Sequence, residues 1–233
     1  MELQKTTETG QAERRRWYDD ACGTAFALEM IGERWSILII RELLLGPRRF
    51  GEIRAELTGL SANVLTQRLE RLEGFGIVRR EKLPPPASVQ VYGLTEWGYE
   101  AEPVIQMMGR WSTRHPDHDT SLHISPTAIM LSLRAMVVSD IPDNLDLRIG
   151  FRLRGEEFVA HAHKGRVDTS RAEAKDVDAL LECRPGIVAS LAYGTKPLEQ
   201  FEATGELAVE GDRQAAERFF TLFSLPEKIV TGD

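Results

Sequence analysis

The chain has 233 residues, a net charge of −7 and 42% hydrophobic residues, which suits two domains of ordinary size. No apolar run reaches the ~18 residues of a membrane span, and the polar, charged start of the chain lacks the apolar core of a secretory signal. Cys22 and Cys183 lie far apart, which argues against a disulfide framework and favours a cytoplasmic location.

The charge is unevenly distributed along the chain. Residues 14–115 carry a net charge of +2, whereas residues 116–233 carry −7. Within residues 46–82, 8 basic side chains face 5 acidic ones. Affinity for nucleic acid depends on the local patch and not on the whole-chain sum, so the acidic total does not exclude DNA as a partner of the N-terminal half.

The predicted elements of the N-terminal half are mainly helical. Residues 1–16 are expected to form a flexible arm, and helical apolar patterns cover residues 17–31 and 33–45. Gly46-Pro47 ends the second pattern, as a glycine past the end and a proline should. A short helix over 49–57, a turn at Thr58-Gly59-Leu60 and a helix over 61–73 follow, the last with Ser61 as its N-cap.

A hairpin and a final helix complete this half. Residues 77–82 and 89–94 alternate as strands, and the prolines between them exclude a helix there. Thr95 caps a helix that is expected to run to about Trp111. Two helices joined by a short glycine-containing turn and followed by a hairpin are typical of a winged helix-turn-helix.

In that arrangement the second helix of the pair lies in the major groove. Asn63 and Gln67 suit adenine, and Arg71 suits guanine or phosphate. Phosphate contacts are expected from the loop before the first motif helix and from the hairpin. The alternative is that this face is only solvated surface. The predicted DNA-binding residues are Arg48, Arg49, Ser61, Asn63, Thr66, Gln67, Arg71, Arg79, Arg80 and Lys82.

The order and spacing of several motifs over about 90 residues resemble the HxlR family of bacterial winged-helix regulators. The motifs are Cys22, Ile31-Gly32-Glu33-Arg34-Trp35, Ile40-Arg41-Glu42-Leu43, Arg49-Phe50-Gly51-Glu52-Ile53, Leu65-Thr66-Gln67-Arg68-Leu69, Leu72-Glu73, Gly76-Ile77-Val78-Arg79-Arg80, Val91-Tyr92-Gly93-Leu94-Thr95, Gly98 and Trp111. The family cysteine is usually followed by proline, whereas Gly23 follows Cys22 here. The resemblance implies a homodimer held by the first helix and the helix after the wing, and DNA reading by the helix after Ser61.

The cysteine and the histidines allow further hypotheses. Some regulators that resemble this chain sense oxidants or quinones at the position of Cys22, which would require a lowered pKa and access. The alternative is a small apolar side chain packed near the dimer interface. Five histidines, at positions 115, 118, 123, 161 and 163, suggest a metal site, but a polar linker does not fix ligand geometry, so we expect no metal and no cofactor.

The C-terminal half has a different pattern. Residues 116–126 form a polar linker, and residues 127–233 are predicted to be an α+β domain. Helices are expected over 127–138, 176–183, 186–193 and 213–223. Strands are expected over 145–151, 158–163 and 201–209.

This region resembles the sterol-carrier-protein-like domain, chiefly in Gly205-Glu206-Leu207-Ala208-Val209-Glu210-Gly211-Asp212 before an apolar helix. The resemblance implies a twisted sheet covered by helices, with an apolar ligand cavity between them. The candidate lining residues are Met130, Leu133, Val137, Phe151, Phe158, Leu191, Phe219, Phe220 and Phe223. Aromatic stripes at helical spacing are also typical of plain core.

The sequence contains no phosphate-binding loop, no Gly-x-Ser-x-Gly elbow and no His-Glu-x-x-His motif, so an enzyme is not expected. The leading hypothesis is a homodimeric regulator of double-stranded DNA that an apolar small molecule controls through the C-terminal domain. The alternatives are a C-terminal domain that is structural or binds protein, redox sensing at Cys22, and a lipid carrier with an appended DNA-binding module.

Overall fold

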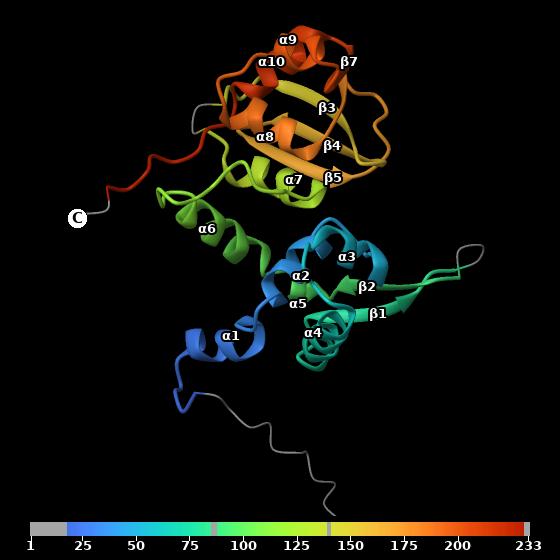
Figure 1. Cartoon of the computed structure of the whole chain (residues 1–233), viewed down its shortest axis with the longest axis vertical. Helices are drawn as coiled ribbons and strands as arrows, with labels where there is room; N and C mark the ends of the chain where they lie inside the picture. Colours follow the sequence, from blue (N-terminus) through green and yellow to red (C-terminus); the bar gives the residue numbers. More distant parts are fainter. Residues whose placement is uncertain (1–17, 85–87, 139–140, 231–233) are drawn as a thin grey trace, which may run out of the picture.

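The computed structural model describes residues 18–84, 88–138 and 141–230. The expected flexible arm, residues 1–16, lies outside the described residues. Two hydrophobic cores are present, one in each half of the chain. Figure 1 shows the N-terminal half with its hairpin extended to one side, and the C-terminal half stacked against helices of the first.

The N-terminal half is a winged helix-turn-helix. Its elements are α1 (Gly23–Ile31), α2 (Ser36–Leu43), α3 (Phe50–Glu56), α4 (Ala62–Gly74), β1 (Val78–Lys82), β2 (Gln90–Leu94), α5 (Glu96–Tyr99) and α6 (Glu102–Ser112). β1 and β2 pair antiparallel, with Arg80 opposite Tyr92. The turn between α3 and α4 depends on Gly59, whose φ of +88° lies in the left-handed region that side chains rarely adopt.

One helix expected at the end of this half is two. The chain breaks between α5 and α6, at Glu100 and Ala101. Gly98 allows α5 to approach the start of the hairpin, because a Cβ there would lie 2.2 Å from the carbonyl oxygen of Ile77. Pro103 stands in the first turn of α6, where its missing N–H costs nothing. α6 thereby runs toward α7 (Figure 1), with Ile105 packed against the N-terminal core and none of its residues buried.

The C-terminal half is an α+β region around one mixed sheet. Its elements are α7 (Pro126–Ala135), β3 (Asp146–Leu153), β4 (Glu156–His163), β5 (Arg166–Arg171), β6 (Ala179–Cys183), α8 (Pro185–Tyr193), α9 (Leu198–Ala203), β7 (Leu207–Gly211) and α10 (Arg213–Phe220). The strand order is β5-β4-β3-β6-β7. β3 and β6 are parallel, and the other neighbours are antiparallel.

One sheet face is buried and the other is largely exposed. Ile149 and Phe151 of β3 and Phe158 of β4 are fully buried, in the same core as residues of α7, α8 and α10. The opposite face carries polar side chains such as Arg152 and His161. This alternation is typical of sheets with one solvated face.

Two predictions for this half are wrong. Residues 179–183 belong to the predicted helix 176–183 but form the strand β6. Residues 201–203 belong to the predicted strand 201–209 but form the end of the helix α9. Ala, Leu and Glu favour helices locally, but Leu181 is fully buried between β3 and β7. Tertiary packing therefore overrides the local preference at β6. β5 was not expected as a strand.

α7 joins the two halves. Its Ile129, Met130 and Leu133 lie in the C-terminal core, whereas Leu131 lies in the N-terminal core. Figure 1 shows α7 between the sheet and α2. No helix in the described part of the chain is long and apolar enough to cross a membrane.

Candidate DNA-binding surface

α4 presents the predicted reading face. Ser61 caps the helix by accepting a hydrogen bond from the Val64 amide at 3.3 Å. Leu65, Leu69 and Leu72 are buried. This places Asn63, Thr66 and Gln67 on the exposed side. Uncharged polar groups on one helix face are suited to base edges.

The arginines of α4 point away from that face. Arg71 donates a hydrogen bond to the Glu29 carbonyl at 2.7 Å, and its guanidinium lies over the Phe75 ring. Arg68 pairs with Glu33 and donates to the Arg34 carbonyl. Arg71 was predicted to read guanine or phosphate. In this structure it instead ties α4 to the end of α1.

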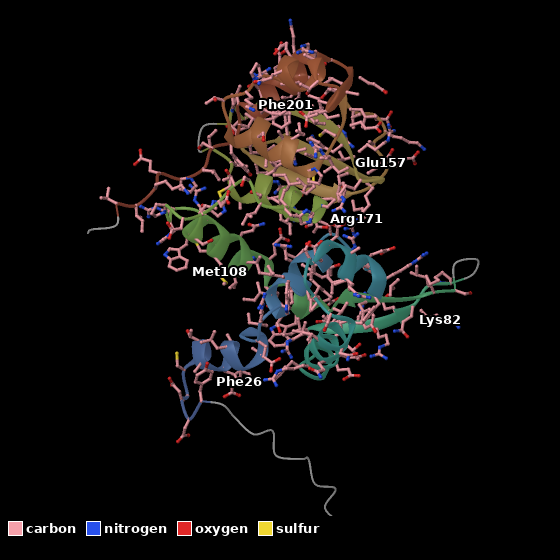
Figure 2. The ribbon with its side chains drawn as sticks, viewed as in Figure 1. Phe26, Lys82, Met108, Glu157, Arg171 and Phe201 are labelled. Atoms are coloured by element: carbon pink, nitrogen blue, oxygen red, sulfur yellow. The ribbon has the colours of Figure 1, made fainter. Side chains whose placement is uncertain are left out.

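The hairpin supplies exposed cations, some of them already paired. Arg79 pairs with Glu81, and Arg80 lies 3.1 Å from Glu73 and over the Tyr92 ring. Both are at least two-fifths exposed. Lys82 stands on the part of the hairpin that extends away from the body (Figure 2). The basic excess counted from sequence is therefore partly neutralised by neighbouring carboxylates.

Arg48 and Arg49 are adjacent but differ in environment. Arg49 is half-exposed at the N-cap of α3, with its Nε 3.8 Å from Glu52 Oε1. Arg48 is 4% exposed and donates to Glu156 at 2.6 Å. The prediction that Arg48 contacts phosphate is corrected by this burial, because its guanidinium lies at the junction with the C-terminal half.

That junction is a buried cluster of charges. Arg171 of β5 donates to Glu156 at 2.8 Å, to Thr127 at 2.9 Å and to the Leu45 carbonyl at 3.1 Å. Arg48 donates to Thr127 and lies 3.6 Å from the fully buried Glu42. Figure 2 labels Arg171 where the two halves meet. We call Glu42, Arg48, Thr127, Glu156 and Arg171 the junction cluster.

The junction cluster was missed by sequence reasoning. Arg48 and Glu156 are 108 positions apart, and no local pattern links them. One residue could have indicated the cluster. Glu42 falls within the apolar face of α2, and a buried carboxylate is destabilising unless it has a partner.

α1 and α6 lie on the flank away from the hairpin (Figure 1) and carry exposed apolar side chains. α6 has no buried residue. Val104, Met107 and Trp111 are 52%, 67% and 74% exposed, and Phe26 of α1 is 48% exposed. Figure 2 shows Phe26 and Met108 on the same flank. We call these side chains the α1/α6 face.

The two cysteines differ in reactivity. Cys22 is exposed at the N-cap of α1. A hydrogen bond from the Thr24 backbone amide lowers the pKa of its thiol below the ordinary value, with a further contribution from the Thr24 side chain. Burial raises the pKa of the Cys183 thiol to about 12. Only Cys22 therefore has the access and acidity that thiol chemistry requires.

The histidines form no metal cluster among the described residues. His161 and His163 stack with ring centroids 4.1 Å apart. Their Nε2 atoms lie 2.7 Å from Asp146 and 2.8 Å from Asp168. These pairs cross-link the exposed face of the sheet.

The predicted ligand-lining residues fill the C-terminal core. Phe151, Phe158 and Phe219 are fully buried, and the Phe151 and Phe219 rings are 6.0 Å apart. Leu191, Phe220 and Phe223 also reach an open depression of about 480 Å³. Most of these side chains pack against one another in the core. A larger cavity lies elsewhere, beside the linker.

Comparison with known proteins places the N-terminal half. A family model described as HxlR-like helix-turn-helix matches residues 30–120. The HTH-type transcriptional regulator YvaP of Bacillus subtilis is 37% identical over 91 residues, 39% of this chain and 84% of that protein. The regulator YodB of the same organism is 40% identical over 86 residues, 37% of this chain and 77% of YodB. The structure of reduced YodB aligns with 42% of this chain and 97% of its own, with a TM-score of 0.38.

Proposed function

The chain belongs to the HxlR-like helix-turn-helix family, and from that membership we propose that it is a homodimeric, DNA-binding transcriptional regulator controlled through its C-terminal half. The observation that carries the DNA-binding part is the exposed row Asn63, Thr66 and Gln67 on a capped helix beside an extended hairpin. Such a helix inserts its first turns into the major groove while the hairpin contacts the backbone.

The dimer is supported by the α1/α6 face. Contiguous exposed patches of large apolar side chains on a soluble protein typically mark an interaction site, and Val104, Met107 and Trp111 on one helix are each more than half exposed. Two-fold pairing through this face would give two α4 helices for two half-sites about one DNA turn, ~34 Å, apart. The acidic C-terminal half would not add to DNA affinity directly. Its influence would pass through α7, which contacts α2, and through the junction cluster, which includes Arg48 and holds the Leu45 carbonyl in the segment between α2 and α3.

Selection of bound fragments from genomic DNA tests the proposal. We expect the full chain to enrich sites with two-fold symmetry and to bind them as a dimer, measured by light scattering of the complex. Affinity for the selected site should exceed that for random DNA by ~10³-fold or more. Equal affinity for both at physiological salt would contradict the proposal.

A second candidate is thiol sensing at Cys22, favoured by its exposure and lowered pKa. YodB, 40% identical, has been solved with quinone bound. We expect iodoacetamide to modify Cys22 faster than free cysteine at pH 7 and to leave folded Cys183 unmodified. Mass spectrometry of the wild type and of Cys22→Ser measures both. Loss of operator binding on quinone treatment that persists in Cys22→Ser would eliminate this candidate.

A further inference from the structure

The linker between the two halves covers a large cavity. The cavity has a volume of about 930 Å³ and is bounded by the linker, α7, α8 and the segment after α10. This segment is held in place because the Ile229 amide donates to the Arg114 carbonyl at 2.8 Å and Lys228 donates to the His115 carbonyl at 2.9 Å. The volume falls in the range of small-molecule sites, ~300–1,000 Å³.

An apolar groove continues from this cavity. It has a volume of about 410 Å³ and lies between α2, α6 and α7. Thr113, His118, Ile124 and Ser132 line both spaces, so the two meet at the linker. The groove is lined mainly by aliphatic and thioether side chains, among them Leu44, Ile105, Leu131 and Met136.

The charged groups of the cavity favour an anion. Its cations are Lys196 and Lys228. Its carboxylates are turned elsewhere: Asp117 is 89% exposed, and Asp119 accepts two hydrogen bonds from Ser121, one from the amide at 2.8 Å and one from the hydroxyl at 2.6 Å. His118 and His123 also line the cavity. Lys228 donates to the His115 carbonyl and Lys196 lies over the Phe201 ring, but no ion pair with a carboxylate is formed by either lysine among the described residues. Their positive charge is therefore not neutralised, whereas the negative charge is largely directed to solvent or to Ser121.

A hydrogen-bonding pair marks the wall between the polar and the apolar parts. Ser132 Oγ and Tyr193 Oη lie 2.6 Å apart, and Ser132 lines both spaces. Burial raises the pKa of the Tyr193 hydroxyl above its ordinary value, so the hydroxyl stays protonated at neutral pH. It can therefore donate to an anionic head group.

We propose that the cavity and groove together bind an amphipathic carboxylate, with its head group near Lys196, Lys228 and Tyr193 and its apolar body along α7 into the groove. This deepens and rests on the proposed function, because it gives the controlling ligand a site and a chemical class. The occupant would touch α2, the dimerisation helix α6 and α7 at once. Met108 and Trp111 line the groove and also belong to the α1/α6 face. A bound ligand would therefore contact both the proposed dimer interface on α6 and the helix α2, which packs against the helix-turn-helix.

Calorimetric titration of the full-length protein with decanoate, decyltrimethylammonium and hexanoate tests the site. We expect one decanoate per chain, binding at least tenfold tighter than either other probe. Lys196→Met/Lys228→Met should weaken decanoate by at least tenfold, since one lost charge-assisted hydrogen bond corresponds to about tenfold and the variant removes both ammonium groups. Ala128→Leu, which fills the groove, should reduce decanoate to the affinity of hexanoate. The matched control Lys175→Met changes an exposed lysine paired with Glu173 and should have no effect.

Absence of decanoate binding would overturn the inference, as would equal binding of the cationic probe or equal weakening by Lys175→Met. The same protein is then titrated with its selected DNA site in the presence and absence of decanoate. Selective carboxylate binding with no change in DNA affinity would leave the site in place and remove ligand control from the proposed function. Sequence-specific DNA binding without any carboxylate binding would overturn the ligand site and leave the proposed DNA-binding function in place.

Discussion

At the scale of single residues, α4 carries exposed uncharged polar side chains on one side and arginines that hold it to α1 and the segment after α1 on another. Asn63, Thr66 and Gln67 are exposed, whereas Arg68 and Arg71 are turned back to Glu33 and to the Glu29 carbonyl. Sequence reasoning places the exposed row correctly because helical periodicity determines which side is buried. It misplaces Arg48 and Arg71, because the partners that hold an arginine come from other parts of the chain.

Replacement of Gln67 by alanine tests the reading role. A bidentate amide–adenine contact contributes ~1–3 kcal/mol of discrimination, so Gln67→Ala should lower the preference for the selected site by about that amount and leave binding to random DNA unchanged. Competition gel shifts measure both affinities. Glu70→Ala on the same helix is the contrast: it removes a negative charge and should strengthen binding to all DNA alike. If Gln67→Ala lowered the affinity for the selected site and for random DNA equally, Gln67 would contact the DNA backbone and not a base.

Glu56 provides a prediction on pH and stability. Burial raises the pKa of its carboxyl above the ordinary 4.5, and Arg154, 3.2 Å away, counteracts this only in part. A raised pKa means that the folded state binds the proton more tightly than the unfolded chain does. The contribution of Glu56 to stability therefore falls as pH rises from about 4.5 through the folded-state pKa.

Glu56→Gln should consequently raise the free energy of unfolding at pH 7 and have progressively less effect as the pH is lowered toward 4.5. Urea titrations of both proteins across this range measure the difference. The exposed Glu182, paired with Arg152, serves as the control, since its replacement by glutamine should change stability by less than ~1 kcal/mol at any pH. A larger loss for Glu56→Gln at pH 7 than at pH 4.5 would contradict the argument.

At the scale of elements, the sequence predicts well those helices and strands that a local periodic pattern defines, and poorly those that pairing with a distant strand defines. α4 and the hairpin strands are found close to their predicted bounds, because each carries its own periodic pattern and its own stop signal. α2, predicted over 33–45, is found at its predicted place but spans only Ser36–Leu43. β6 is an interior strand of the sheet, between β3 and β7, and a short apolar run there is compatible with either a helix or a strand. Its parallel pairing with β3 is non-local and leaves no periodic signal in the sequence.

The helix α6 carries the prediction on assembly. Met107 and Trp111 are exposed in the single chain, so Met107→Glu/Trp111→Glu should leave the fold of the chain intact and place two charges in the proposed dimer interface. We expect a monomer at micromolar concentration by light scattering. Affinity for a two-half-site operator should fall by at least tenfold. Val230→Glu, at a side chain that is 96% exposed, should remain dimeric. A dimeric double variant would move the interface away from α6.

At the scale of the whole molecule, the junction cluster links the two halves through hydrogen bonds and ion pairs. Glu156 lies between Arg48 and Arg171, accepting from both at 2.6 and 2.8 Å, and the charge of Arg48 is among the causes that lower the pKa of Arg171, after burial. Without the Glu156 charge the two guanidinium groups would repel each other, with Glu42 as the remaining carboxylate of the junction cluster. Removing one partner of a fully buried pair costs ~3–5 kcal/mol, and we expect a smaller loss here because the side chains of Glu156 and Arg171 are 24% and 22% exposed.

Glu156→Gln should therefore both destabilise the chain and separate the unfolding of its halves. The chain's four tryptophans, at positions 17, 35, 97 and 111, all lie in the N-terminal half, so tryptophan fluorescence follows that half, whereas circular dichroism follows both. In the wild type the two signals should change together in urea, as one cooperative transition requires. In Glu156→Gln the midpoints should fall and diverge, because the halves no longer share a satisfied junction. Glu182→Gln, on the exposed sheet face, should retain coincident transitions. Coincident and unshifted transitions in Glu156→Gln would show that the linker and α7 couple the halves without the junction cluster.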